Sequence, residues 1–148
     1  MKELLEKIKA ELQSKLNNIR SVDIFITPHA NLIPGATEFP AIGIKDGAVK
    51  RHELAGNALD KELSVSLISY VKMYPDEQSI MGGSGFKGVL EIVEDLHGIL
   101  DENLLGLEGM EDAFCEAEKE SEMFGKPEDG LQRKIITIHM KEGVIDNG

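Results

Sequence analysis

Hydrophobic residues in the first twenty positions recur at intervals of three and four, the spacing that places them on one side of a helix. These residues are Leu4, Leu5, Ile8, Leu12, Leu16 and Ile19. Glu3 and Lys7 are oppositely charged residues four positions apart, and such pairs stabilise the polar side of a helix. The pattern therefore predicts an amphipathic helix from residue 2 to about residue 20.

Two short stretches that follow are typical of β-strands. Residues 22–27 are rich in β-branched side chains and end at a proline, and residues 39–45 form a brief apolar run. Residues 29–37, which contain Asn, Pro and Gly, predict a loop between them. The pair Asp46-Gly47 predicts a tight turn that closes the second strand and opens a connecting loop to about residue 60.

The clearest strand and the clearest helix lie in the middle of the chain. Apolar and polar residues alternate over residues 63–73, with only Ile68 and Ser69 out of phase. Residues 86–100 return to a spacing of three and four, which predicts a second amphipathic helix with Ser84 as its cap. Its apolar positions are Phe86, Val89, Leu90, Val93, Leu96 and Leu100.

The composition of residues 113–123 favours a helix, but their glutamates recur with a period of two. A helix would place Glu116 against Glu120 and Glu118 against Glu122, and both are unfavourable contacts between like charges. We therefore predict a strand with four carboxylates on one face. They belong to Glu116, Glu118, Glu120 and Glu122.

Residues 131–140 alternate again and predict the last strand, followed from about residue 142 by a polar tail that frays. The order of elements predicts one α+β domain over residues 1–148, with a largely antiparallel sheet of about five strands and two helices on one face. A doubly wound α/β fold would need strands and helices in regular alternation. The pattern lacks this alternation.

Acidic residues are concentrated in residues 101–129, which hold eleven Asp and Glu against two Lys in a chain of net charge −11. Such a surface repels phosphate, and a chain without Trp has few rings for base stacking. We expect no tight binding of DNA or RNA. We also expect no signal peptide and no membrane anchor, because no stretch approaches the roughly 20 apolar residues that a spanning helix needs.

The segment Gly83-Ser84-Gly85-Phe86-Lys87-Gly88 matches the dinucleotide-binding pattern G-x-G-x-x-G and precedes a predicted helix. Residues 74–81 separate it from the preceding strand, whereas the fingerprint requires glycines in a tight strand-to-helix turn. The sequence favours a flexible hinge at the start of the helix. A small-molecule or nucleotide-binding α+β domain remains the alternative interpretation.

No other pattern predicts catalysis, a metal or a cofactor. The histidines are scattered and lack metal-ligand spacing; they are His29, His52, His97 and His139. We interpret His97 as a border residue of the second helix. The single cysteine, Cys115, has no internal disulfide partner, and pairing it with a distant histidine as nucleophile and base has no local signature. A buried thiol is the favoured interpretation.

The four glutamates of residues 116–122 leave two interpretations open. A strand rises about 3.3 Å per residue, so their carboxylates would follow one face over roughly 20 Å. The first interpretation is an exposed edge that the charges keep soluble. The second is a negative wall along which DNA passes without sticking.

In this order of elements the chain resembles the tail-terminator, or tail-completion, proteins of long-tailed bacteriophages. The resemblance rests on the amphipathic N-terminal helix, on Val22-Asp23-Ile24-Phe25-Ile26-Thr27-Pro28 and on Phe39-Pro40-Ala41-Ile42-Gly43-Ile44. It continues through the strand at residues 63–73, the helix at residues 86–100 and the two closing strands, and so covers nearly the whole chain.

The resemblance implies a structural virion subunit and not an enzyme. Members form a homo-oligomeric ring, by expectation a hexamer, that caps the tail tube and joins it to the filled head. The implied partners are further copies of the chain, the tail tube protein and the head–tail connector proteins. The implied location is the virion tail, with the host cytoplasm during assembly. The acidic stretch is not part of the resemblance; under the second interpretation above, Glu116, Glu118, Glu120 and Glu122 would line the opening of such a ring.

Overall fold

The computed structural model describes residues 1–54, 56, 58–126 and 129–145. Three helices and six mostly antiparallel strands confirm the α+β class. The helices are α1 (Lys2–Lys15), α2 (Gln78–Met81) and α3 (Val89–Leu100). The strands are β1 (Ile24–Ile26), β2 (Ala41–Glu53), β3 (Ala58–Lys72), β4 (Met110–Glu118), β5 (Glu122–Phe124) and β6 (Leu131–Ile145). Among the described residues, no helix is long and apolar enough to cross a membrane.

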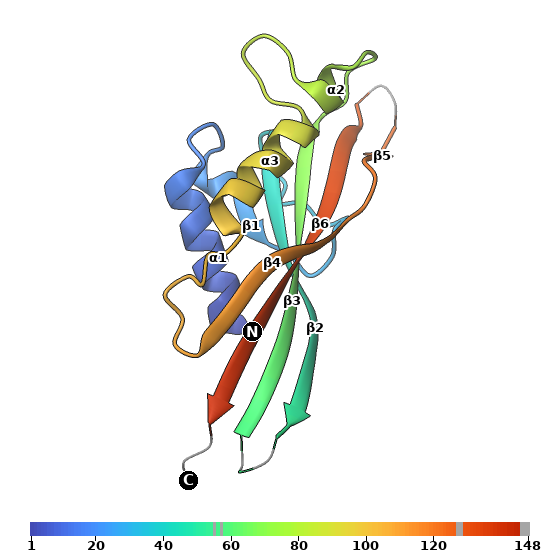
Figure 1. Cartoon of the computed structure of the whole chain (residues 1–148). Coiled ribbons are helices and arrows are strands. Elements are labelled where there is room, and N and C mark those ends of the chain that lie inside the picture. The colour runs from blue at the N-terminus through green and yellow to red at the C-terminus, as the bar shows by residue number, and fades with distance from the viewer. Residues whose placement is uncertain (55, 57, 127–128, 146–148) are drawn as a thin grey trace.

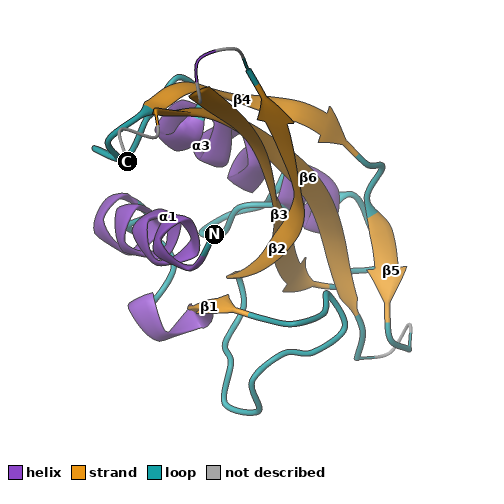
Figure 2. Ribbon diagram, turned by 90° about the horizontal axis from the view of Figure 1, so that it is seen from below, coloured by secondary structure: helices purple, strands orange, loops and turns teal. Residues whose placement is uncertain are grey.

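The strands form one sheet in the order β1-β2-β3-β6-β4 (Figures 1 and 2). β5 pairs with the start of β6, at residues 131–133. Among the described strands, only the pair β1 and β2 is parallel; the other pairs are antiparallel. In Figure 2, α1 and α3 lie on the same side of the sheet. The predicted arrangement of two helices on one face is therefore confirmed, with a short α2 added beside α3.

The main core lies between the sheet and the two long helices. Leu4, Ile8 and Leu12 of α1 are spaced by four and are buried, as the helical pattern requires. Alternate residues of the sheet meet them, so that burial follows a period of two along each strand. The fully buried core side chains include Ile42, Ile44, Leu67, Ile92, Leu96, Ile136 and Ile138.

A smaller core on the other face explains why Ile68 and Ser69 break the alternation of β3. Here Phe25, Ile68 and Tyr70 are covered by residues of the long loop between β1 and β2. Both faces of this end of β3 are therefore buried, and consecutive residues are apolar or small. The Tyr70 hydroxyl donates a hydrogen bond to the carbonyl of Ala30 in that loop. Burial raises the pKa of Tyr70 to about 12, which keeps this donor protonated.

The first helix is shorter than predicted and the first strand begins later. α1 ends at Lys15, and residues 21–23 form a turn of 3₁₀-helix before β1. The buried carboxylate of Asp23 accepts hydrogen bonds from the Arg20 side chain and, at 3.1 Å, from the backbone N–H of Glu38. The Arg20 hydrogen bond lowers the pKa of Asp23. These contacts fix an irregular segment that hydrophobic periodicity cannot distinguish from a helix.

The predicted turn at Asp46-Gly47 is wrong. β2 continues through this pair to Glu53, and a β-bulge between Asp46 and Val49 absorbs the extra residue against β3. The expected loop to residue 60 is thus largely strand. The polar tail predicted from residue 142 is also wrong as far as residue 145, because β6 stays paired with the start of β3. Residues 146–148 lie outside the described residues.

Together these extensions form an arm, which we define as residues 47–53, 58–62 and 141–145. Figure 1 shows its three strands projecting beyond the helices. The side chains from Lys50 to Glu53 are all exposed. The arm is the main feature of the fold that the sequence pattern did not predict.

The second long helix begins at Val89 and not at Phe86, and its N-cap is Gly88 and not Ser84. The backbone N–H of Gly88 instead donates to the carboxylate of Glu91 at 3.4 Å. A side chain at Gly88 would collide with the carbonyl of Ile80, only 2.4 Å from a Cβ. The close approach of α2 therefore requires glycine at the helix start and leaves no room for a capping side chain.

Two glycines should respond in opposite directions to replacement by alanine, because only Gly47, in the bulge of β2, lies close to another strand. A Cβ at Gly47 would lie 2.6 Å from the backbone oxygen of Ser64 in β3. We expect Gly47→Ala to lower the free energy of unfolding by about 1–3 kcal/mol in urea denaturation. Gly98→Ala in α3 is the control. Its Cβ would meet no atom within 4 Å, and alanine favours a helix over glycine, so this change should raise the free energy of unfolding by about 0.5–1 kcal/mol. Unchanged stability of Gly47→Ala would contradict the strand assignment.

Candidate functional site

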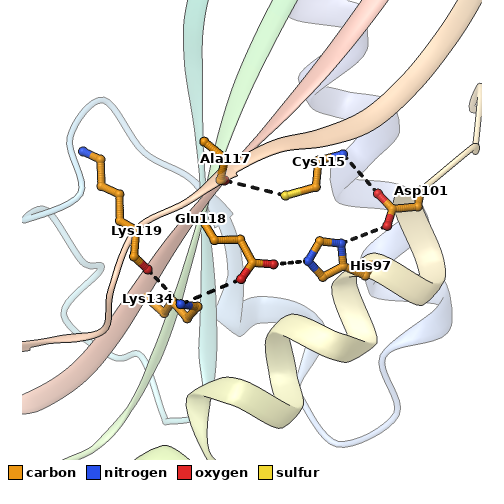
Figure 3. Close-up of polar contacts among 7 residues, drawn as sticks. All are labelled: His97, Asp101, Cys115, Ala117, Glu118, Lys119 and Lys134. Carbon is orange, nitrogen blue, oxygen red and sulfur yellow. Dashed lines mark hydrogen bonds and ion pairs between the residues drawn. The ribbon is translucent and has the colours of Figure 1, made fainter.

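A cluster of chemically active side chains lies where the last turn of α3 meets β4 (Figure 3). His97 and Asp101 come from the end of α3, Cys115 and Glu118 from β4, and Lys134 from β6. All five lie on the helix side of the sheet, at the open edge formed by β4. They are separated in sequence by as many as 37 positions, so only the tertiary fold brings them together.

A β-bulge places Cys115 and Glu118 on the same face. In a regular strand, residues three positions apart point to opposite faces. Here Cys115 pairs with Ile138 and Ala117 with Thr137, so the extra residue Glu116 has no partner in β6. Bulges re-aim side chains and are common beside functional sites. In this case the bulge directs both a thiol and a carboxylate towards α3.

His97 contacts a carboxylate at each ring nitrogen. Nδ1 lies 2.9 Å from Asp101 Oδ2, and Nε2 contacts Glu118 Oε1. Burial by itself would lower the pKa of His97, but the hydrogen bonds to Glu118 and Asp101 outweigh it and raise the pKa above its ordinary value. An imidazolium is also favoured in the last turn of a helix, where the backbone carbonyls carry partial negative charge.

Asp101 orients two of its neighbours. One carboxylate oxygen faces His97, and the other accepts a hydrogen bond from the backbone N–H of Cys115 at 3.1 Å. Because Asp101 is also the C-cap residue of α3, it joins the end of the helix to β4. The relative position of the imidazole and the thiol is therefore set by one side chain.

Cys115 is half-buried, and its thiol donates a weak hydrogen bond to the carbonyl of Ala117 at 3.6 Å. Burial, followed by the nearby charges of Glu118 and Asp101, raises the pKa of Cys115. A thiol held protonated at neutral pH is a poor nucleophile, so the cluster lacks the activation that cysteine catalysis requires. The thiol nevertheless lies close to an imidazole, a proximity that no local sequence pattern indicated.

Lys134 provides a positive charge at the rim of the cluster. Its side chain is 11% exposed, and Nζ lies 3.9 Å from Glu118 Oε2. The same ammonium donates a hydrogen bond to the carbonyl of Lys119 at 2.8 Å. These two contacts hold the chain just after β4 against β6 and offset part of the negative charge of the site.

The predicted strand over residues 113–123 is confirmed in two pieces, β4 and β5, but the single acidic face is wrong. β4 ends at Glu118, and the bulge leaves Glu116 out of register. Glu118 points towards His97, whereas Glu122 of β5 pairs with Arg133 at 2.8 Å. Arg133 also bonds Asn31 in the loop that covers the opposite side of the sheet. The four carboxylates therefore do not line one face.

The contacts of the Gly-rich segment favour a structural role. Gly83 and Phe86 close a tight turn through an N–H to carbonyl hydrogen bond of 3.2 Å, and the Phe86 ring stacks on Tyr74. Lys87 Nζ is engaged by Asp95 Oδ2 at 2.6 Å. A phosphate at the start of α3 would have to displace the Glu91 carboxylate, whose charge opposes it.

The remaining histidines are dispersed. His29 accepts a hydrogen bond from the backbone N–H of Asn31 at 3.0 Å, and His139 lies edge-on to the Phe114 ring. His52 in the arm is 3.5 Å from Glu62. A hollow of about 560 Å³ is on the face opposite the helices. Its lining mixes Lys119, Glu120, Glu122 and Arg133 with His29, Ala30, Asn31 and Ile135.

Comparison with known proteins gives the site no precedent. No protein-family model matches the chain, and no curated protein is significantly similar in sequence.

The two carboxylates around His97 predict a pH-dependent contribution to stability. Since the folded-state pKa is raised from 6.5, the contribution is fully present below about pH 6.5 and is lost as pH rises through the folded-state pKa. We expect the unfolding free energy of the wild type, relative to His97→Gln, to fall over this range. Urea denaturation between about pH 6 and pH 9 in EDTA measures it. His52→Gln is the control and should follow the wild type. Parallel profiles for the wild type and His97→Gln would contradict the prediction.

Proposed function

We propose that the chain is a structural subunit that assembles with further copies of itself into a closed ring, in the manner of the phage tail terminators that its sequence resembles. The proposal rests chiefly on one observation, the three-stranded arm that projects from the domain (Figure 1). Strands that extend past their own core bury few of their side chains within the subunit and so gain little stability from burial. Contact with a neighbour would supply the missing burial.

The arm offers both an apolar anchor and a hollow. Val49 is 41% exposed on its outer strand, and Leu54, which directly follows that strand, is 45% exposed. A hollow of about 430 Å³ lies at its base. It is lined by Met1, Val49, Arg51, Lys61, Leu63 and Glu142. A stable interface buries roughly 800 Å² on each partner, an area for which a projecting arm is well suited.

The charges at the two edges of the sheet are complementary. Within the described sheet, β2 beyond Lys45 and β4 occupy opposite edges. Residues 45–53 hold three Lys or Arg against two carboxylates, whereas β4 has four carboxylates and no Lys or Arg. Exposed Phe114 adds an apolar contact to the acidic edge. Opposite edges of opposite sign favour head-to-tail contacts, which form rings when the rotation closes.

Further support comes from the charge of the whole chain. A net charge of −11 disfavours attraction to DNA, which suits a subunit whose opening DNA would cross. By the resemblance, the ring would be a hexamer in the virion tail, bound to the tail tube protein on one side and to head–tail connector proteins on the other. The proposed role is mechanical and involves no catalysis.

Assembly is the direct test. We expect the purified chain, incubated with tail tubes, to form closed rings at the tube end that are visible by electron microscopy. Light scattering after size exclusion measures whether rings also form in solution. Absence of rings both in solution and on tubes would contradict the proposal.

Charge reversal on the arm tests which edges meet. Arg51 lies opposite Lys61 in the β2–β3 pair, so Arg51→Glu removes a like-charge contact and should leave the subunit folded. We expect it to weaken ring assembly at low salt, and the defect should shrink as added salt screens the repulsion that the new carboxylate introduces. Adding Glu111→Lys and Glu116→Lys, at the two bulges of β4, should restore assembly. Lys7→Glu on α1 carries the same charge change as a control. Equal assembly by Arg51→Glu and the wild type would exclude this arrangement of edges.

A nucleotide-binding domain, the alternative function, predicts different behaviour. If the Gly-rich segment held phosphate, ATP or NAD would raise the melting temperature and Lys87→Ala would abolish the shift. We expect no shift with either ligand. Lys87→Ala should lower the free energy of unfolding by less than about 1 kcal/mol, since its ion pair with Asp95 is partly exposed. A ligand-induced shift lost in Lys87→Ala would favour the alternative.

A further inference from the structure

We propose that His97, Cys115 and Glu118 form a binding site for a divalent transition metal of the Zn²⁺ class, independent of the proposed ring. One ligand atom from each residue lies within 4.8 Å of the other two. Bonds of about 2.0–2.3 Å to nitrogen, oxygen and sulfur place tetrahedral ligands roughly 3.3–3.7 Å apart. Shifts of about 1 Å in side-chain position would therefore close the three groups around one ion.

The types of ligand select the class of metal. A thiolate with an imidazole and a carboxylate suits zinc and its neighbours in the first transition row, whereas Mg²⁺ and Ca²⁺ prefer oxygen ligands alone. The His97 and Glu118 side chains are 28% and 40% exposed, so an ion could reach the site from solvent. Three protein ligands leave a fourth position for water or for a group from a partner.

Asp101 supplies the outer contact that such sites use. Metal-binding histidines usually donate their second ring N–H to a carboxylate, which fixes the ring and its tautomer. Asp101 faces Nδ1 of His97 and leaves Nε2 directed at Glu118. The same carboxylate holds the Cys115 backbone. One residue thus orients two of the three ligands, as Figure 3 shows.

The bulge in β4 is the second, independent observation. Without the extra residue, Cys115 and Glu118 would face opposite sides of the sheet and could not share an ion. The competing explanation is an ion pair, in which a proton on His97 Nε2 joins the helix to Glu118. That explanation accounts for the histidine and the glutamate, but it gives the thiol no role.

Cobalt substitution distinguishes these explanations, because Co²⁺ occupies zinc sites and a bound thiolate adds a near-ultraviolet charge-transfer band. The full chain, without a histidine tag and freed of metal with EDTA, would be titrated with CoCl₂ under reducing conditions. We expect one ion per chain, a thiolate band, and displacement of cobalt by ZnCl₂. Zn²⁺ should also raise the melting temperature, which Mg²⁺ should not do.

Variants identify the ligands. Cys115→Ser should lose the thiolate band, and His97→Gln and Glu118→Gln should each bind Co²⁺ at least about tenfold more weakly. Asp101→Asn should keep the band at saturation but weaken binding about 10–100-fold, as outer contacts of metal sites do. His52→Gln, which alters the other close pair of histidine and glutamate, is the matched control and should bind like the wild type.

Absence of the thiolate band in the wild type at excess cobalt would overturn the proposal and leave the ion pair as the explanation. Equal weakening by His52→Gln and His97→Gln would also overturn it, since binding would then come from scattered surface groups. Because the wild-type measurement stands alone, a variant that fails to fold does not remove the test. All readouts use the isolated subunit, so failure to form rings does not affect them.

Discussion

The antiparallel pairing of β3 with β6 is the constraint on which the rest of the structure depends. It runs without a register shift from Ala58 opposite Ile145 to Lys72 opposite Leu131. The two strands are the centre of the sheet, and every other strand except β1 pairs with one of them. Since the paired residues of β3 and β6 lie 59 to 87 positions apart in sequence, the whole segment between the two strands, including α3 and β4, must pack within the loop that this pairing closes.

Because β3 and β6 pair regularly, the register shifts next to them belong to their neighbours β2 and β4. β2 and β4 are both bulged against a straight partner, and in each strand one bulge marks the point where the strand changes its role. In β2 it lies where the strand leaves the core and continues into the arm. In β4 it turns Cys115 and Glu118 towards His97. Both proposals, the arm as an assembly element and the cluster as a metal site, thus depend on one extra residue in an edge strand.

The two proposals also meet at the acidic edge. β4 carries the carboxylates that would face a neighbouring arm, and its end is tied to α3 through Asp101 and Glu118. An ion held there would stiffen this edge and reduce its negative charge. Such an effect would be local, because exposed charges are screened over about 8 Å at physiological salt. The assembly proposal therefore does not require the ion, and the ion does not require assembly.

Sequence periodicity determined the α+β class, both long helices and the central strands, because burial on one face imposes a period that survives in any context. It could not set the end of α1 or the continuation of β2 past Asp46-Gly47, where Asp23, Arg20 and a bulge against β3 decide the backbone. It also missed the cluster. His97 and Cys115 are eighteen positions apart, and their proximity arises only when the bulge in β4 and the cap at Asp101 direct both towards one point.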